Sequence, residues 1–538
     1  MHSGPVSQQT ALRQEWGSDP TRALPVSRRV RLRAPAGTRR WVWLVAGLTA
    51  LLRLPFVGAP LSPDEGGFLL VAGAWHRGTS LYGDLWVDRP PLLLALFRVA
   101  DLVGGQAHAL TALRVLGCVA AGLTVAAVGL AARQLVGGRS GPVWAASVAG
   151  VLLLTPAGGG SVVNGELLAS PLVALGVLAA LHAARPGPTA ARWAFLAGAA
   201  GAAAILVKQN MLDVAVFVVA LLLAGAWRDR TWVRSARQAG VAISGGVVGA
   251  AAVLLPAWAA GTTPWGVFEA MYPFRLKAAA VMNVNADERV THGLAMVSTW
   301  VTTGAPLLLA AFVVWAAWAV RRGPRDPRLL ALLALLVFDA VFIALGGSFW
   351  LHYVVQLVVP TGLAAGLLAT RARTPGRAVV AVVVVAGLFG WGVGLTARTT
   401  AAGDVVGTAL AGAARPGDSV ASLLGDADVV RSSGLRVAAY PYLWSLPART
   451  LDPGFQRLGR VLSGPDRPTW VVVRGPRTLT ELRAAHVGLD EHYRDVATVC
   501  DHVVFLRDDV RRPVPTPTAA CRQSFLGAPA STLIGVNP

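Results

Sequence analysis

The sequence predicts a multi-pass α-helical membrane protein, with about eleven transmembrane helices and a small C-terminal extracytoplasmic α/β domain. The chain of 538 residues is 54% hydrophobic and has a mean hydropathy of +0.55, which is far from the composition of an ordinary soluble protein. Several of its stretches of roughly 18 residues or more carry no charge, and this length crosses the hydrocarbon of a bilayer. Their Ala, Gly, Leu and Val runs suit helices and lack the alternation of barrel strands.

The apolar runs predict eleven spans, and the loop charges predict their direction. Five loops, at alternate connections, hold fifteen Arg against two acids, whereas the other connections hold six basic residues against seven acids. Positive charge gathers on the cytoplasmic side, so we expect the N-terminus inside and the C-terminal domain outside the cell (plasma) membrane. The predicted spans are 41–58, 109–131, 142–158, 165–184, 192–207, 211–227, 238–260, 294–320, 329–346, 350–369 and 378–397.

Residues 1–40 predict a disordered basic cytoplasmic tail, because they are polar, contain proline and end in a run of arginines. The formal net charge of +20 lies mostly in short loops between apolar runs, which argues against nucleic acid as a partner. Residues 41–397 then form the transmembrane domain, with a first outer loop at 59–108. Within that loop, the segment 90–105 is too short and too charged to span, and it indicates an interfacial amphipathic helix.

A soluble α/β domain is predicted for residues 398–510, followed by a Pro-rich tail at 511–538. Expected strands lie at 419–424, 436–444 and 468–475, with a helix at 479–489 and a strand pair around residues 496–500 and 502–506. Cys500 and Cys521 both fall in the part placed outside the cell, where oxidation is permitted, so we expect a disulfide between them. The alternative is two unpaired thiols.

The polar residues most indicative of function begin with Asp64 and Glu65, which follow the first apolar run almost directly. Charges at a membrane boundary are expensive to bury and usually have a role. The same loop continues with Tyr82, Asp88 and Arg89 before Pro90-Pro91. Acids, a base and aromatic side chains together predict a polar patch at the membrane surface. The alternatives are a hydrated loop, aromatic anchors and a local Asp88–Arg89 pair.

Three further groups lie at the outer ends of later spans. Asn164 and Glu166 open the fourth span and have a helix cap as their plainer explanation. Lys208 and Gln209 join the fifth span to the sixth, where a lysine can simply extend to the interface or can meet a phosphate. The third group, His352-Tyr353, begins the tenth span. All three groups are predicted on the same face of the membrane.

In their order along the chain, these residues resemble the GT-C glycosyltransferases, closest to the family 39-like group that includes protein O-mannosyltransferases and the aminoarabinose transferases of lipid A. The similarity rests on Arg53-Leu-Pro, Pro63-Asp64-Glu65, Tyr82 with Asp88-Arg89-Pro90-Pro91, Lys208-Gln209 and His352-Tyr353 with Pro360, and it covers about residues 41–370. Arg89 stands where lysine is commoner, and Gly66-Gly67 make the Asp64 region Gly-rich.

The resemblance implies transfer of a sugar from a polyprenyl-phosphate donor to an acceptor hydroxyl on the extracytoplasmic face, with inversion. Asp64 is then the expected general base, and Glu65 holds the acceptor or supports the loop. The cations expected at the donor phosphate are Arg89 and Lys208, with Arg53 and His352 behind them. Further substrate contacts are expected from Tyr82, Asp88, Asn164, Glu166, Gln209 and Tyr353.

No Cys/His cluster indicates a metal site, and a divalent cation at Asp64 is the one cofactor that the sequence leaves open. The expected partners are the lipid-linked donor, membrane lipids and a glycan, lipid or protein acceptor. Two other classes stay open: a transporter or flippase of lipid-linked intermediates, and a non-catalytic scaffold. A transporter needs ionisable groups near mid-membrane, and here Asp213, Asp339, Arg114 and His182 lie near span ends or in isolation.

Overall fold

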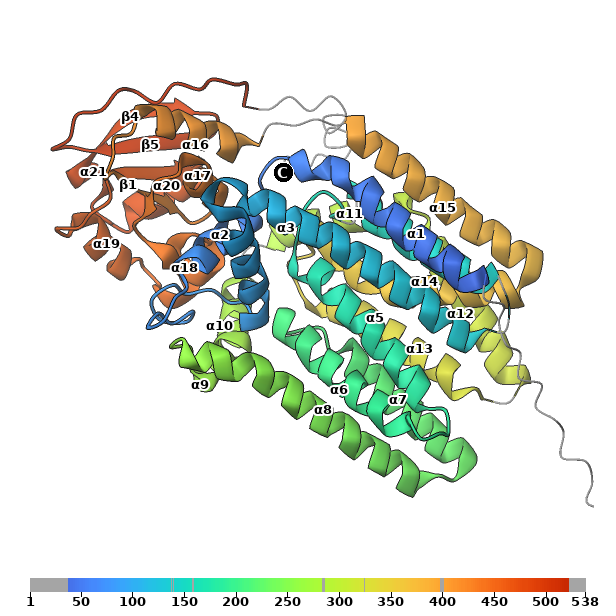
Figure 1. Ribbon diagram of the computed structural model, residues 1–538. Coiled ribbons are helices and arrows are strands. Elements are labelled where there is room, and N and C mark those ends of the chain that lie inside the picture. Colours follow the sequence, from blue (N-terminus) through green and yellow to red (C-terminus); the bar gives the residue numbers. More distant parts are fainter. Residues whose placement is uncertain are drawn as a thin grey trace, which may run out of the picture.

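The computed structural model describes residues 37–521, apart from 137, 139, 157–158, 283–285, 324 and 397–400. Long helices lie side by side in one bundle, and a small domain built on a β-sheet sits at one end of it (Figure 1). The predicted class, a multi-pass α-helical protein with a small C-terminal α/β domain, is therefore confirmed, whereas the count of eleven spans and the side of the membrane on which the domain lies stay predictions. The first helix begins at Gly37, inside the predicted tail, while residues 1–36 and 522–538 lie outside the described part.

Nine helical segments in the described residues are long and apolar enough to cross a membrane, by length and composition. The predicted spans 142–158 and 211–227 correspond to shorter helices, α4 (Ser140–Leu154) and α7 (Asp213–Asp229). The nine are α1 with η1 (Gly37–Gly58), α3 (Pro91–Leu135), α5 (Gly165–Ala183), α6 (Ala190–Val207), α8 (Trp232–Ala259), α12 (Ala305–Arg322), α13 (Pro327–Leu345), η3 with α14 (Leu351–Arg371) and α15 (Arg373–Thr396).

One predicted span is not a single helix. The span predicted at 294–320 is wrong, because α11 (Ala286–Thr302) ends before Gly304, whose φ of +71° breaks the helix ahead of α12. The separate helix predicted at 90–105 is present as the first part of α3, because Gly105, with a non-helical φ of +59°, divides it from the helix that follows. Its position at a membrane interface stays a prediction.

Glycines let the helices approach closely. A Cβ at Gly198 in α6 would overlap the backbone of Ala242 in α8, and one at Gly245 in α8 would overlap the backbone of Phe195. Small residues at helix contacts replace the hydrophobic driving force that is missing within lipid, because they allow extensive van der Waals contact.

The C-terminal domain contains a five-stranded sheet in the order β2-β1-β3-β5-β4. Strand β1 pairs in parallel with β2 and β3, whereas β5 pairs antiparallel with β3 and β4. The strands are β1 (Ser419–Leu423), β2 (Arg436–Val437), β3 (Trp470–Arg474), β4 (Tyr493–Val499) and β5 (His502–Arg507). The helices are α16 (Ala402–Ala413), α17 (Ala427–Ser433), α18 (Ser445–Leu451), α19 (Gln456–Ser463), α20 (Pro476–Ala484) and α21 (Leu489–His492).

Two predicted elements of this domain are shorter than expected. The strand expected at 436–444 is a strand only as far as Val437, and the chain then turns into the 3-10 helix η4 (Tyr440–Tyr442), whose proline cannot donate to a sheet. The helix expected at 479–489 ends at Ala484, since His486 takes a φ of +50°, and the chain becomes helical again only after Gly488, with a φ of +79°, at α21.

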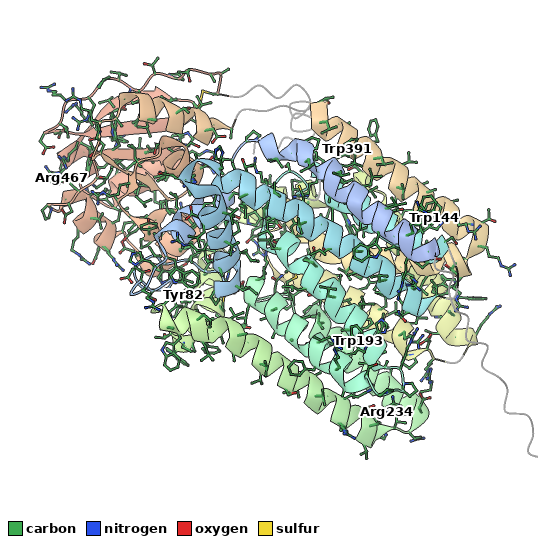
Figure 2. The ribbon with its side chains drawn as sticks, viewed as in Figure 1. Tyr82, Trp144, Trp193, Arg234, Trp391 and Arg467 are labelled. Carbon is green, nitrogen blue, oxygen red and sulfur yellow. A yellow bond between two sulfur atoms is a disulfide. The ribbon has the colours of Figure 1, made fainter. Side chains whose placement is uncertain are left out.

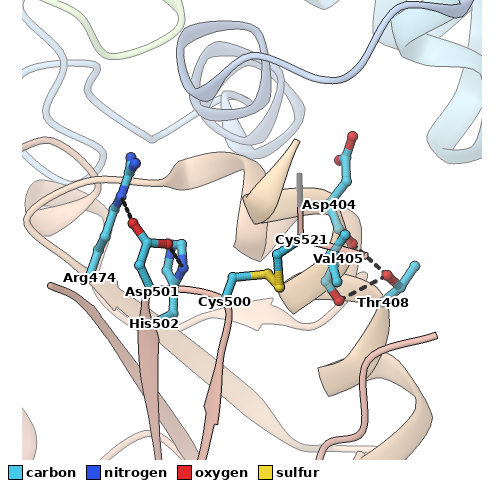
Figure 3. The surroundings of a disulfide bond; sticks show 8 residues. All are labelled: Asp404, Val405, Thr408, Arg474, Cys500, Asp501, His502 and Cys521. Carbon is cyan, nitrogen blue, oxygen red and sulfur yellow. Dashed lines mark hydrogen bonds and ion pairs between the residues drawn. A yellow bond between two sulfur atoms is a disulfide. The ribbon is translucent and has the colours of Figure 1, made fainter. Parts of the chain in front are cut away.

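Cys500 and Cys521, the pair predicted from the sequence, are joined in a disulfide with 5.3 Å between their Cα atoms (Figure 3). The segment between them returns along the sheet, where Arg512 pairs with Asp418 at 2.6 Å. The described part of the predicted tail, residues 511–521, is therefore held against the domain.

The two ends of the bundle carry different residues. Arg133 is close enough to interact with Arg39 and Arg185, and Arg328 lies near Arg185, so these basic residues gather at one end. Figure 2 shows Arg234 near the start of α8, far from Tyr82, while Arg467 lies in the C-terminal domain. The outer-loop residues thus lie at the end that carries this domain.

Candidate active site

Asp64 and Glu65 lie in the first turn of a short helix, α2 (Pro63–Ala74), within the predicted outer loop. The residues at the start of α2 explain why the helix begins there. Ser62 accepts a hydrogen bond from the Glu65 N–H, and the Glu65 carboxylate accepts one from the Ser62 N–H, which is a capping box with proline at the first position. Both carboxylates therefore lie on a capped helix, and Figure 1 shows this helix at the end of the bundle next to the C-terminal domain.

Glu65 is fully buried and its oxygens are occupied. Arg114 of α3 donates to both of them, at 3.2 and 2.9 Å, and the Val163 N–H donates to Oε1 at 2.9 Å. Arg114 also donates to the carbonyls of residues 57, 59 and 60. Two roles were expected for Glu65, namely holding the acceptor and supporting the loop. These contacts fit the second role, because Glu65 and Arg114 together hold the loop before α2. Arg114, one of the charges predicted near span ends or in isolation, is thus not isolated, because it pairs with Glu65 across the fold.

Asp64 has the opposite surroundings. Its side chain is half-buried, and no described residue makes a hydrogen bond or ion pair with it. It lies close enough to Arg89, Arg275 and His352 to interact electrostatically with each of them. An accessible carboxylate among cations is free to accept a proton from a bound group.

Asp88 bridges two arginines. One oxygen pairs with Arg89 at 2.7 Å and the other with Arg275 of α10 (Pro273–Met282), also at 2.7 Å. Burial lowers the pKa of Arg89, but the nearby carboxylates, Asp88 first and then Asp64, raise it above the ordinary value. Burial lowers the pKa of Arg275, although Asp88 opposes this. Arg275 was not among the predicted site residues, because the basic residues of the 261–293 loop cannot be distinguished by their position in the sequence.

The other half of the group comes from α5, the end of α6 and η3 (Leu351–Leu357). Lys208 forms an ion pair with the buried Glu166, and the Lys208 Nζ lies 4.9 Å from the centre of the Tyr353 ring. His352 Nε2 is 3.7 Å from the same Glu166 carboxylate. Lys208 also lies near Arg89 and Arg275, so these three cations are close enough to interact with one another.

The structure places the other predicted residues on supporting contacts. Tyr82 donates its hydroxyl to the Arg89 carbonyl at 2.9 Å, and Asn164 caps α5 by accepting from the Leu167 N–H at 2.9 Å. Gln209 lies beside Lys208 with its side-chain oxygen buried. Arg53 departs from its predicted place at the donor phosphate, because its guanidinium is buried and donates to the carbonyls of residues 153 and 162 at 2.8 and 2.7 Å.

A chain of hydrogen bonds fixes η3. Asn210 donates to Gln356 at 3.1 Å, and Gln356 donates to Asp339 of α13 at 2.9 Å. Asp213 lies next to Asp339, so these two carboxyl groups, which were predicted to lie near span ends or in isolation, lie together. The chain ties the turn of Lys208 to the helix of His352 and Tyr353.

No group of three or more His, Cys, Asp or Glu side chains in the described residues is arranged to hold a metal ion. Asp88 and Glu166 are already paired with cations, which leaves Asp64 alone for such a role. The divalent cation at Asp64 stays a prediction.

An apolar cavity of about 310 Å³ adjoins this region between the end of α2, the first part of α3 and the end of α8. It is lined by Leu92, Ala95, Val253 and Pro256, with His76 and Arg77 at one side. Leu92 is three residues from Arg89, so an apolar space begins close to the cations.

Comparison with solved structures shows that the chain shares the fold of ArnT from Cupriavidus metallidurans. The structure of ArnT bound to undecaprenyl phosphate superposes with a TM-score of 0.56 at 17% identity, covering 87% of this chain and 98% of ArnT. The apo state of the same protein gives 0.55 at 16% identity, with the same coverage. No protein-family model and no curated protein sequence matches the chain.

Proposed function

We propose that the chain is a membrane glycosyltransferase that moves a sugar from a polyprenyl-phosphate donor to an acceptor hydroxyl on the extracytoplasmic face, with inversion. The observation that carries the proposal is one accessible carboxylate, Asp64, beside two cations, Arg89 and Arg275, with a third cation, Lys208, near both arginines. Such a transfer needs cations that stabilise the anionic leaving group and a base that accepts the hydroxyl proton.

Each side chain has a defined task in this reaction. The acceptor oxygen forms a bond to the anomeric carbon while the bond from that carbon to the phosphate oxygen breaks. Asp64 takes the hydroxyl proton, a role that contributes roughly 10²–10⁴-fold in rate. The electron pair of the broken bond goes to the phosphate, whose negative charge the three cations stabilise in place.

The carboxylates Asp88 and Glu166 orient these cations rather than neutralise the site completely. Asp88 fixes Arg89 and Arg275, and Glu166 fixes Lys208. Donor N–H groups remain for a phosphate, since an ammonium has three and a guanidinium five. The buried Nε of Arg275 has no hydrogen-bond partner among the described residues.

A lipid-linked donor is favoured over a nucleotide sugar. The apolar cavity beside Leu92 and Val253 suits part of an isoprenoid chain, and the first part of α3 suits the membrane interface. ArnT, which shares the fold, was solved with undecaprenyl phosphate. The acceptor is a hydroxyl of a glycan, lipid or protein.

The test is an assay with a panel of radiolabelled polyprenyl-phosphate sugars, using the purified chain and membranes as the source of acceptor. We expect label transfer from at least one such donor, release of free polyprenyl phosphate, and inverted anomeric configuration in the product. Transfer from a nucleotide sugar in lipid-depleted detergent would contradict the proposal, as would movement of labelled lipid across vesicles without any sugar transfer.

A further inference from the structure

The C-terminal domain packs directly against the helix that carries Asp64. Gly66 of α2 faces the start of α17, where a Cβ at Gly66 would lie 2.9 Å from the Cα and 3.0 Å from the N of Asp428. These are backbone atoms, which cannot rotate away as a side chain can. The two helices therefore meet at a distance that only glycine permits.

A second contact lies one residue further along α2. A Cβ at Gly67 would overlap the indole of Trp444, which precedes α18. The centres of the Trp444 and Phe68 rings also lie 5.5 Å apart. On the same Phe68 ring, the Arg89 guanidinium lies 5.5 Å from the ring centre. Trp444 is thus connected through one aromatic ring to a cation of the candidate site.

Polar contacts reinforce this junction at its two edges. Asp404 of α16 accepts from the Leu61 N–H at 3.1 Å, just before α2, and from Ser432 of α17 at 2.5 Å. Arg431 of α17 donates to the carbonyl of Gln106 at 2.7 Å, next to the kink of α3. The helix α10, which carries Arg275, contacts α18. The domain therefore touches α2, which carries Asp64, the region of the kink in α3, and α10, which carries Arg275 (Figure 1).

We propose that the C-terminal domain is the positioning element of the active site: α17 and Trp444 hold α2 so that the Asp64 carboxylate meets the acceptor hydroxyl. Trp444 is a positioning residue, since it acts through α2 and Phe68. The catalytic part of this inference rests on the proposed function, but the mechanical part does not. Misplacement by about 1 Å can lower a rate by roughly 10²-fold, so a contact this tight has kinetic consequences.

The first test compares two glycines of the same helix. Gly66→Ala places a methyl group against the Asp428 backbone, whereas Gly73→Ala meets only Asp101 side-chain atoms at 3.7 Å or more, an ordinary contact. We expect Gly66→Ala to lower kcat about tenfold or more with donor KM within twofold, because Lys208 and Arg275 lie on other elements. Gly73→Ala should leave both constants unchanged. Equal kcat values for the two variants would overturn the proposal.

The second test separates positioning from folding. Trp444→Ala should lower kcat and speed amide hydrogen exchange across residues 61–74, while Trp444→Phe should restore part of both, since it keeps a ring against Phe68. Binding of a polyprenyl phosphate should keep its stoichiometry, which a merely unfolded enzyme would lose. Unchanged exchange of α2 in Trp444→Ala would refute the proposal. This exchange measurement needs no turnover, so it decides the inference even if no lipid-linked sugar proves to be a donor.

Discussion

Asp64 and Glu65 are neighbours on one turn of α2, but the fold surrounds them differently. Glu65 is enclosed by Arg114 and two backbone N–H groups, whereas Asp64 opens toward the cations. An internal ion pair is destabilised strongly when one partner is removed, because the other charge stays buried. An accessible carboxylate carries no such penalty. The two residues should therefore respond to amide substitution in opposite ways.

We expect Asp64→Asn to lower kcat by about 10²-fold or more while thermal unfolding is unchanged, because the amide keeps the shape and loses the base. Glu65→Gln should instead lower stability by several kcal/mol, of the order of 3–5, through the uncompensated Arg114. Initial rates and thermal unfolding check both variants. Asp466→Asn, at an exposed site in the C-terminal domain, is the matched control. Full turnover by the Asp64 variant would place the base elsewhere.

Arg275 should act on the donor. A hydrogen bond to a charged group contributes about 1.5–3 kcal/mol, so Arg275→Gln should raise the KM for the polyprenyl-phosphate sugar by roughly 10–100-fold. Acceptor KM should change little. Asp88 keeps Arg89 as a partner, so no carboxylate is left unpaired. The control is Lys277→Gln, which removes an exposed charge from the same helix. A donor KM equal to that of the control would remove Arg275 from the phosphate site.

At the scale of elements, η3 is held by Gln356 between α13 and the Lys208 turn. Gln356→Leu removes both hydrogen bonds and leaves Asn210 and Asp339 without this partner. We expect turnover to fall about tenfold or more, since His352 and Tyr353 lose their fixed position relative to Lys208. Donor titration at saturating acceptor measures the effect. Wild-type kinetics in this variant would show that η3 needs no such tie.

The helix α17 contains a carboxyl group that is sensitive to pH. Burial, followed by the charges of Asp426 and Asp404, raises the pKa of Asp428 to about 7. Asp428 lies at the contact with Gly66, with its side chain against Gly403 of α16. The folded domain therefore binds this proton more tightly than the unfolded chain does.

Because of this proton, the stability of the folded protein depends on pH. The stabilisation that comes from the raised pKa of Asp428 is complete below the ordinary carboxyl pKa of about 4, and it is lost as the pH rises through about 7. We expect the thermal unfolding temperature to fall as the pH rises across this interval. Asp428→Asn, which stays neutral, should remove that part of the pH dependence. Unfolding curves between pH 4 and 8 measure it, and identical slopes for both proteins would contradict the assignment.

For the molecule as a whole, the charge asymmetry predicts the orientation in the membrane. Reporter fusions at residues 190, 280 and 420 should read cytoplasmic, outside and outside, since arginines of the short loops stay on the cytoplasmic side. In the structure, Arg133 in the last turn of α3 lies near Arg39 and Arg185, so basic residues gather at one end of that helix, and Figure 1 shows this end of α3 away from the C-terminal domain. A cytoplasmic signal at residue 420 would place the site on the wrong face for the proposed donor.

The membrane class, the approximate positions of most spans and the grouping of polar residues at one end of the bundle could be predicted from the sequence, because hydropathy and loop charge are local properties. Errors came where a local break outweighs composition. Gly304 splits the span predicted at 294–320, and Pro441 shortens the strand predicted at 436–444. The disulfide between Cys500 and Cys521 also followed from local facts, namely compartment and separation.

Only the tertiary structure decided which charges pair. That Glu65 meets Arg114, that Arg53 binds backbone carbonyls, and that Arg275 joins Asp88 depend on segments distant in sequence that come within about 3 Å of each other. No periodicity or spacing encodes such distances, because they result from the packing of all the helices together. The contact of Gly66 and Gly67 with α17 and Trp444 is of the same kind. The sequence shows that both residues are glycines, but it does not show which neighbours leave no room for a side chain there.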